Sequence, residues 1–149
     1  MFKLYYASAI DVCQKKAFKQ IEEFKKIFSK YDIQVYGAGF GNSPIIPLGC
    51  SEVYKAVITA YDMRQIRKCD ILLVVTDLKT FAAGTFEEMM YARTNGLYVI
   101  LLVLNKRKGY KPIHSEIKNI FLESHADKII YSIDELEQVL RQVTLKECK

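Results

Sequence analysis

The sequence predicts an α/β fold, in which a doubly wound sheet of five parallel strands carries helices on both faces, as in flavodoxin-like and Rossmann-like proteins. Short runs that are apolar on both faces alternate along the chain with segments in which apolar residues recur every three or four positions. The first pattern is typical of buried parallel strands, and the second of helices packed on a sheet. The chain of 149 residues has the usual length of one domain, so we expect a single domain over residues 1–149.

Five segments have the length and composition of strands. They are residues 2–7, 32–36, 70–76, 97–104 and 128–131. Two helices are indicated by apolar rows at helical spacing, which are Phe18, Ile21, Phe24 and Phe28 in one and Val53, Val57, Ala60, Met63 and Ile66 in the other. A closing helix is expected over residues 133–143, introduced by Ser132 and Asp134 as residues that favour a helix start.

The composition limits the class of protein. Half of the residues are hydrophobic, 26% are charged and the net charge is +5, which is a globular balance that favours anionic ligands. The chain has no concentrated basic tract, so binding to a nucleic acid polymer is not implied. A membrane span of roughly 20 apolar residues and a signal peptide are both missing from the pattern, so we expect a cytoplasmic protein without a membrane partner.

Cysteine and histidine spacing argues against two kinds of site. The four cysteines form no CxxC pair and the chain has two histidines, so neither a zinc site nor a disulfide framework is expected. In a doubly wound sheet the ligand lies beyond the carboxyl ends of the strands. The loops to search are residues 5–8, 37–49, 76–85 and 105–114. Within the second of these, GAGFG lacks the third glycine of a phosphate-binding loop because Asn42 stands there, so an ordinary loop is favoured.

Glu88 is the first candidate for chemistry, and two interpretations of it stay open. Thr85 and Glu88 form the T-x-x-E pattern of a capping box, in which Thr85 is the N-cap and the glutamate accepts a hydrogen bond from the backbone. Alternatively Glu88 is a free carboxylate, since Gly84 and Ala92 provide no cation four residues away. The helix dipole would keep such a carboxylate ionised, which suits a nucleophile.

Asp62 and Tyr5 are the second and third candidates. Asp62 lies on an apolar row between Ile58 and Ile66, so its side chain is either exposed at the edge of the row or directed into a pocket. If Asp62 and Glu88 converge, one can attack while the other transfers a proton. Tyr5 and Tyr6 point to opposite faces of their strand, and one of them could donate its phenol to a carboxylate.

Three stretches, KLYYAS, AYDMRQIRKCDILLVVTD and GTFEEMMYARTNGLYVILLV, together resemble the nucleoside 2-deoxyribosyltransferase family, which includes the related deoxynucleoside 5′-monophosphate N-glycosidases. The resemblance runs from Lys3 to about His114, with G-x-x-x-E followed by Y-A as its central motif. It implies that Glu88 is the nucleophile, that Asp62 contacts the base and that Tyr5 orients the nucleophile. It also implies that His114 reaches the sugar 5′ position in a neighbouring subunit.

The resemblance implies a retaining N-glycoside enzyme that forms a covalent glycosyl-Glu88 intermediate and transfers the deoxyribosyl group to another base. No metal or organic cofactor is required. Its partners would be a small nucleoside or nucleotide and further copies of the chain, with active sites shared in a homo-oligomer. Ser8, Gly84 and Thr85 complete the expected substrate-binding set.

Two alternatives remain beside the transferase. A 2′-deoxynucleoside 5′-monophosphate N-glycohydrolase is favoured by the positive net charge and by Ser8 and His114 as phosphate contacts. A non-catalytic nucleotide-binding module is motivated by Ala82, Phe86 and Met90, which depart from the family pattern around the motif.

Overall fold

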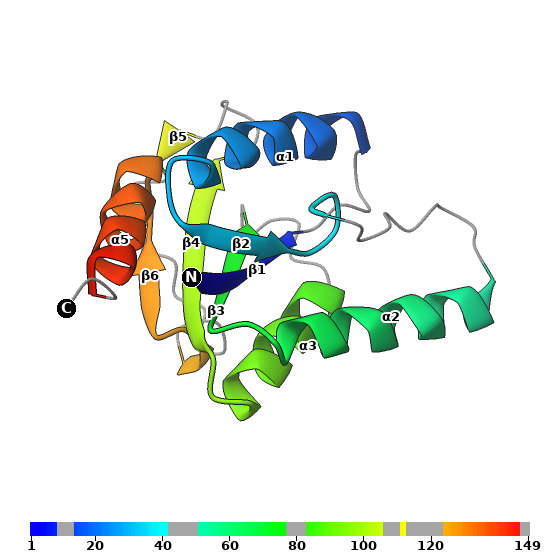
Figure 1. Cartoon of the computed structure of the whole chain (residues 1–149). Helices are drawn as coiled ribbons and strands as arrows, with labels where there is room; N and C mark the ends of the chain where they lie inside the picture. The colour runs from blue at the N-terminus through cyan, green and yellow to red at the C-terminus, as the bar shows by residue number, and fades with distance from the viewer. Residues whose placement is uncertain (9–13, 42–50, 77–82, 106–110, 113–123, 147–149) are drawn as a thin grey trace.

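The computed structural model describes residues 1–8, 14–41, 51–76, 83–105, 111–112 and 124–146. The predicted α/β fold is confirmed, with five parallel strands in the order β2-β1-β3-β4-β6 (Figure 1). These strands are β1 (Phe2–Ser8), β2 (Ile33–Tyr36), β3 (Ile71–Thr76), β4 (Tyr98–Asn105) and β6 (Lys128–Ile130). A two-residue strand that the sequence did not predict, β5 (Lys111–Pro112), pairs antiparallel with the end of β4.

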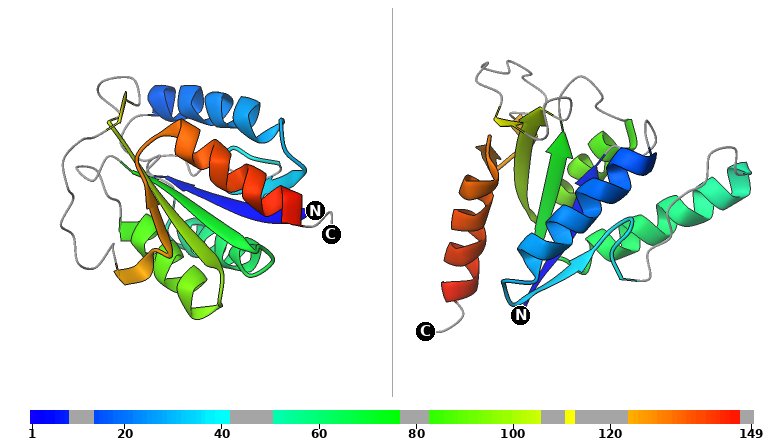
Figure 2. Two further views of the ribbon diagram at one scale, coloured as in Figure 1. Left: turned by 90° about the vertical axis from the view of Figure 1, so that its left-hand side faces the viewer. Right: turned by 90° about the horizontal axis from the view of Figure 1, so that it is seen from above.

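The helices cover both faces of the sheet. They are α1 (Gln14–Phe28), α2 (Glu52–Ile66), α3 (Ala83–Thr94) and α5 (Ile133–Lys146). Helices α1 and α5 lie on one face, and α2 and α3 lie on the other (Figure 2). In this strand order the chain first builds the sheet outward from β1 to β2 and then, from β3 onward, on the other side of β1. This is the flavodoxin-like arrangement.

Strand β1 feeds both cores because its side chains alternate between faces. Leu4 and Tyr6 belong to the core under α1 and α5, where the Tyr6 ring packs against aromatic rings of Phe24 and Phe40. Tyr5 and Ala7 belong to the core under α2 and α3. Strand β1 therefore carries one buried aromatic side chain to each side of the sheet.

The glycines of the GAGFG segment serve a tight turn after β2. Gly37 has φ of 117°, and a Cβ on it would lie 2.3 Å from the carbonyl oxygen of Tyr6, which is far closer than a side chain allows. Gly39 has φ of 83° and packs on the side chain of Ile21. Gly37 lets the turn lie directly on β1 and Gly39 lets it lie on α1, which agrees with the interpretation of GAGFG as a loop.

The apolar rows on α1 and α2 are only partly buried. Phe24 and Phe28 on α1, and Ile66 on α2, are in the core as such rows usually are. Phe18, Val53 and Val57 are instead exposed, at 50%, 75% and 61%. The N-terminal half of α2 extends past the sheet in Figure 1 and in the right-hand view of Figure 2, which agrees with the exposure of Val53 and Val57. Within the described ranges, no helix has the length and apolar character needed to cross a membrane.

Candidate active site

Tyr5 lies at the centre of the candidate site. It is in β1, which is hydrogen-bonded to β2 on one side and to β3 on the other, and its residue is only 1% exposed. Its side chain points to the face covered by α2 and α3. There its hydroxyl donates a hydrogen bond of 3.1 Å to Oε1 of Glu88, a residue 83 positions away in the sequence.

Glu88 is presented by the first half of α3, the helix that follows β3. The prediction that Thr85 is the N-cap of this helix is wrong, because the helix already begins at Ala83 and Thr85 lies inside its first turn. Thr85 is buried, at 5% exposed. The capping-box explanation of Glu88 therefore loses its geometric basis, and the carboxylate is directed toward Tyr5 on the sheet instead.

Asp62 reaches the same phenol from α2. It is half-buried, and burial raises the pKa of its carboxyl to about 6, while hydrogen bonding with Tyr5 acts in the opposite direction. The apolar row that carries Asp62 thus directs it inward, since Ile58 and Ile66 on the same row are in the core. Of the two placements open for Asp62 from the sequence, the structure has the inward one.

The electrostatics keep the phenol protonated. Burial is the main cause that raises the pKa of Tyr5 far above its ordinary value, and the negative charges of Glu88 and Asp62 raise it further. Tyr5 therefore keeps its proton, and donates it in the hydrogen bond to Glu88, at any physiological pH. The arrangement holds two carboxyl groups from different helices around one neutral donor. The pKa of the Asp62 carboxyl lies close to the pH range in which a group can both donate and accept a proton.

The remaining predicted residues occupy different positions. Ser8 is the last residue of β1 and is half-buried. It pairs with Val75 near the end of β3, so it lies at the carboxyl edge of the sheet. Gly84 is exposed in the first turn of α3, and a Cβ on it would meet open space. His114 lies outside the described residues, as does Ala82.

One neighbour of the site was not singled out from the sequence. His125 lies with its ring 5.9 Å from the ring of Phe86, in an edge-to-face contact, and Phe86 is two residues before Glu88. The only sequence signal was that the chain has two histidines, and spacing along the chain gave no reason to bring this one to α3. Among the described residues, no group of three His, Cys, Asp or Glu side chains is arranged to hold a metal ion.

The fold and this geometry define a class: a flavodoxin-like α/β protein with two carboxyl groups gathered around a tyrosine of the first strand. No model of a known protein family and no curated protein sequence matches the chain. Solved structures do match it at the level of fold. A 2-deoxyribosyltransferase from Bacillus psychrosaccharolyticus superposes with a TM-score of 0.69 at 17% identity, over 91% of this chain and 90% of that one.

Two further structures cover nearly the whole chain. A conserved protein from Enterococcus faecalis has a TM-score of 0.67 at 18% identity, over 95% of this chain and 98% of that one. A CMP N-glycosidase from Clostridium botulinum has a TM-score of 0.59 at 16% identity, with the same coverage. All three structures share the α/β fold of this chain, so the fold expected from the sequence is confirmed.

Proposed function

We propose that the protein is a nucleoside 2-deoxyribosyltransferase, which cleaves the N-glycosidic bond of a 2′-deoxynucleoside and passes the deoxyribosyl group to another base. One observation carries the proposal, which is the hydrogen bond from the Tyr5 hydroxyl to Glu88 with Asp62 at the same phenol. The three residues come from β1, α2 and α3 and meet in a half-buried place on one face of the sheet. The similarity in fold to a 2-deoxyribosyltransferase supports the same reaction class.

In the proposed first step, a carboxylate oxygen of Glu88 attacks C1′ from the side opposite the base. The bond from C1′ to the base nitrogen breaks, and its electron pair leaves with the base. The Tyr5 hydroxyl holds the other carboxylate oxygen and so fixes the plane of the nucleophile. A glycosyl ester on Glu88 results. A second base then attacks C1′, and the two inversions give net retention of configuration.

Asp62 is proposed to serve the departing base. With a pKa of about 6, a useful fraction of this carboxyl is protonated near neutral pH, so that it can donate a proton to the leaving nitrogen. In the second step the same group, now ionised, accepts a proton from the incoming base. The two carboxyl groups thus divide attack and proton transfer between them.

The assembly and the remaining binding residues belong to the same proposal. Ser8, Gly84 and Thr85 would contact the substrate, and His114 of a neighbouring copy would reach the sugar 5′ position, so the enzyme would act as a homo-oligomer in nucleotide salvage. No metal or organic cofactor takes part in these steps.

A second candidate is a 2′-deoxynucleoside 5′-monophosphate N-glycohydrolase. The net charge of +5 and the similarity in fold to a CMP N-glycosidase favour it. In this reaction, water replaces the second base at the glycosyl ester, and the phosphate remains on the released sugar.

The test is a substrate panel followed by chromatography. Thymidine with adenine is one reaction, and each deoxynucleoside 5′-monophosphate alone is another. Deoxyadenosine as product supports transfer, whereas free base with deoxyribose 5-phosphate supports hydrolysis. Ligand binding without release of base from any substrate would contradict both enzymatic candidates and favour a non-catalytic nucleotide-binding module.

Glu88→Ala tests the nucleophile in the same panel, and Glu87→Ala is the matched control because Glu87 is the adjacent, exposed carboxylate on α3. We expect Glu88→Ala to lose base release by about 1,000-fold or more, with Glu87→Ala close to the wild type. Mass spectrometry of quenched wild-type protein should show a deoxyribosyl adduct that Glu88→Ala lacks. Full turnover by Glu88→Ala would refute the assignment.

A further inference from the structure

Helix α3 is attached to the rest of the molecule on the flank that faces away from Tyr5. The segment of residues 124–127, which leads into β6, lies beside α3 in Figure 1 and in the left-hand view of Figure 2. Two side chains of α3 contact this segment, Phe86 near the start of the helix and Arg93 in its last turn. The helix that presents Glu88 is therefore held at two points along its outer flank.

The first attachment is Asp127, which divides its carboxylate between the helix and the sheet. Its Oδ1 pairs with Nη1 of Arg93, and its Oδ2 accepts a hydrogen bond of 2.8 Å from the backbone N–H of Val99 in β4. The backbone N–H of Asp127 donates to the carbonyl of Val99, also at 2.8 Å. Because the carboxylate is fixed to the sheet and its side chain is only 21% exposed, the ion pair connects α3 to a rigid point.

The second attachment is aromatic and holds the first half of α3. The rings of Phe86 and His125 meet edge to face with their centroids 5.9 Å apart, and both residues are half-buried. Ala126, the next residue, packs against the core under α2 and α3. The segment is therefore anchored in the same core, and the edge-to-face contact restricts rotation of α3 about its axis.

Glu88 lies between the two attachments along α3 but on a different side of the helix. Phe86 and Arg93 are seven residues apart, so they point to nearly the same side at a separation of about 10 Å along the axis. Glu88 follows Phe86 by two residues, which is about 200° around the helix, and points to Tyr5. A rotation of α3 that breaks either attachment would therefore move the carboxylate away from the phenol.

We propose that the 124–127 segment is a positioning element, which fixes α3 so that the Glu88 carboxylate stays at the Tyr5 hydroxyl. The kinetic consequence rests on the proposed function, because the orientation of Glu88 affects turnover only if this carboxylate attacks C1′. A displacement of about 1 Å at a reacting group costs about 100-fold in rate, so contacts on the far flank of the helix affect turnover without touching the substrate.

The kinetics of base release by Arg93→Gln test the inference. We expect kcat to fall about tenfold with KM within about twofold of the wild type, because only the orientation of the nucleophile changes. Arg93→Lys, which keeps the positive charge, should recover most of the loss. Lys25→Gln is the matched control, because it removes an ion pair with Glu22 on the surface of α1. An Arg93→Gln protein with the kcat of the wild type would overturn the proposal.

A double-variant cycle separates positioning from a general loss of stability. If Arg93 acts through the hydrogen bond between Tyr5 and Glu88, Arg93→Gln should cost little further activity once Tyr5→Phe has released the carboxylate. The combined loss in kcat should then be close to about 100-fold, and well short of about 1,000-fold, which is the product of the two single losses. A combined loss equal to that product would contradict the proposal.

Hydrogen exchange tests the attachment of α3 independently of catalysis. Asp127→Asn keeps an oxygen for the N–H of Val99 but weakens the pair with Arg93. We therefore expect the backbone amides of α3 to exchange at least about fivefold faster, with those of α2 unchanged. Unchanged exchange in α3 would overturn the inference even if the wild type releases base. Faster exchange in α3 together with a wild type that releases no base would support the attachment and refute the proposed function alone.

Discussion

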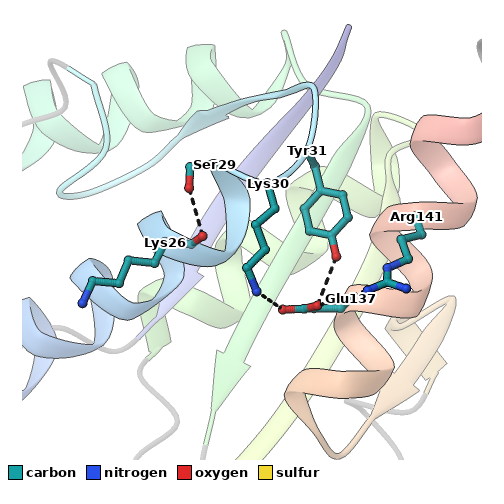
Figure 3. A network of polar contacts seen from close by, with 6 residues as sticks. All are labelled: Lys26, Ser29, Lys30, Tyr31, Glu137 and Arg141. Carbon is teal, nitrogen blue, oxygen red and sulfur yellow. Dashed lines mark hydrogen bonds and ion pairs between the residues drawn. The ribbon is translucent and has the colours of Figure 1, made fainter.

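Two tyrosine–carboxylate pairs lie on opposite faces of the sheet and differ in their surroundings. On the face of α2 and α3, the Tyr5 hydroxyl donates to Glu88 at 3.1 Å, and the other charged group that acts on this phenol is a second carboxylate, Asp62. On the face of α1 and α5, the Tyr31 hydroxyl donates to Oε2 of Glu137 at 3.3 Å (Figure 3). There the charges around the carboxylate are positive.

Glu137 is the carboxylate of an ion-pair network with Lys30 and Arg141. Lys30 Nζ lies 2.8 Å from Oε1 of Glu137, and Arg141 lies 3.8 Å from Oε2, so α5 is connected to the segment between α1 and β2 (Figure 3). The hydrogen bond from Lys30 is the main cause that holds the pKa of Glu137 below its ordinary value. At Asp62, burial raises the pKa to about 6 instead.

The contrast shows two uses of the same side-chain chemistry. Where cations compensate a carboxylate, its ionised form is stabilised, and here the group connects α5 to the segment after α1. Where carboxyl groups are gathered and partly buried, their ionised forms are disfavoured, which is a common feature of functional sites. Three variants would break or sharpen this contrast.

Removing the phenol of the Tyr5–Glu88 pair has the largest expected effect. Tyr5→Phe deletes the donor to Glu88, and a hydrogen bond to a charged group is worth enough to lower kcat about 100-fold. Tyr6→Phe is the matched control, because the adjacent tyrosine points to the opposite face of the sheet. Steady-state release of base measures the effect, and equal losses in both variants would contradict an orienting role for Tyr5.

The raised pKa of Asp62 predicts an intermediate effect. If its protonated form donates to the leaving base, kcat/KM falls about fivefold between pH 6 and pH 7 and this limb is missing in Asp62→Asn. Since the folded-state pKa lies above the ordinary value of 3.8, ionisation costs folding stability as the pH rises from about 4 to 6.

The same variant therefore separates chemistry from stability. Discounted for partial exposure, Asp62→Asn should stabilise the fold by about 1 kcal/mol at pH 7 and by less at pH 4, where the wild-type carboxyl is protonated. Urea unfolding at the two pH values measures this. A destabilised Asp62→Asn protein at pH 7 would show that the carboxylate is compensated after all.

A change in the Tyr31–Glu137 pair has the smallest expected effect, and its effect on stability depends on pH in the opposite sense to that of Asp62. Glu137→Gln should lower Tm by a few degrees at neutral pH and leave base release unchanged. Because the pKa of Glu137 is lowered in the folded protein, its contribution is present above the ordinary carboxyl pKa of 4.5 and is lost as the pH falls below it. Thermal unfolding from pH 7 to pH 3 should show the variant and the wild type converging, and a constant difference would argue against an electrostatic origin.

The sequence predicted β1, β3 and β4 because each follows a short apolar run, and burial on both faces of a parallel sheet favours such runs. The edge strands β2 and β6 are shorter and less buried. Strand β5 was missed because Lys111 and Pro112 carry no apolar pattern and their pairing depends on β4 alone. The cap at Thr85 was placed wrongly because the T-x-x-E pattern fits more than one register near a helix start, and the helix starts two residues earlier.

The residues of the candidate site could be predicted from the sequence, but their burial and their contacts could not. Tyr5, Asp62 and Glu88 could each be named from the residue pattern and the family resemblance. The helical period places Val57 and Asp62 on different faces of α2, but no local pattern encodes which of these faces packs on the sheet. The contact between Phe86 and His125 likewise joins segments that only the tertiary fold brings together.

The adjacency of Tyr5 and Tyr6 has a consequence for how the first strand could change over evolution. Tyr6 packs in an aromatic cluster on the face of α1 and α5, and the adjacent Tyr5 places its hydroxyl on Glu88 on the face of α2 and α3. Gly37 packs directly against the backbone of Tyr6, so this stretch of β1 has almost no freedom to shift. Changes in the surroundings of Glu88 and Asp62 would therefore arise in the helices and loops around a fixed phenol, and β1 would be the last part of the chain to change its shape.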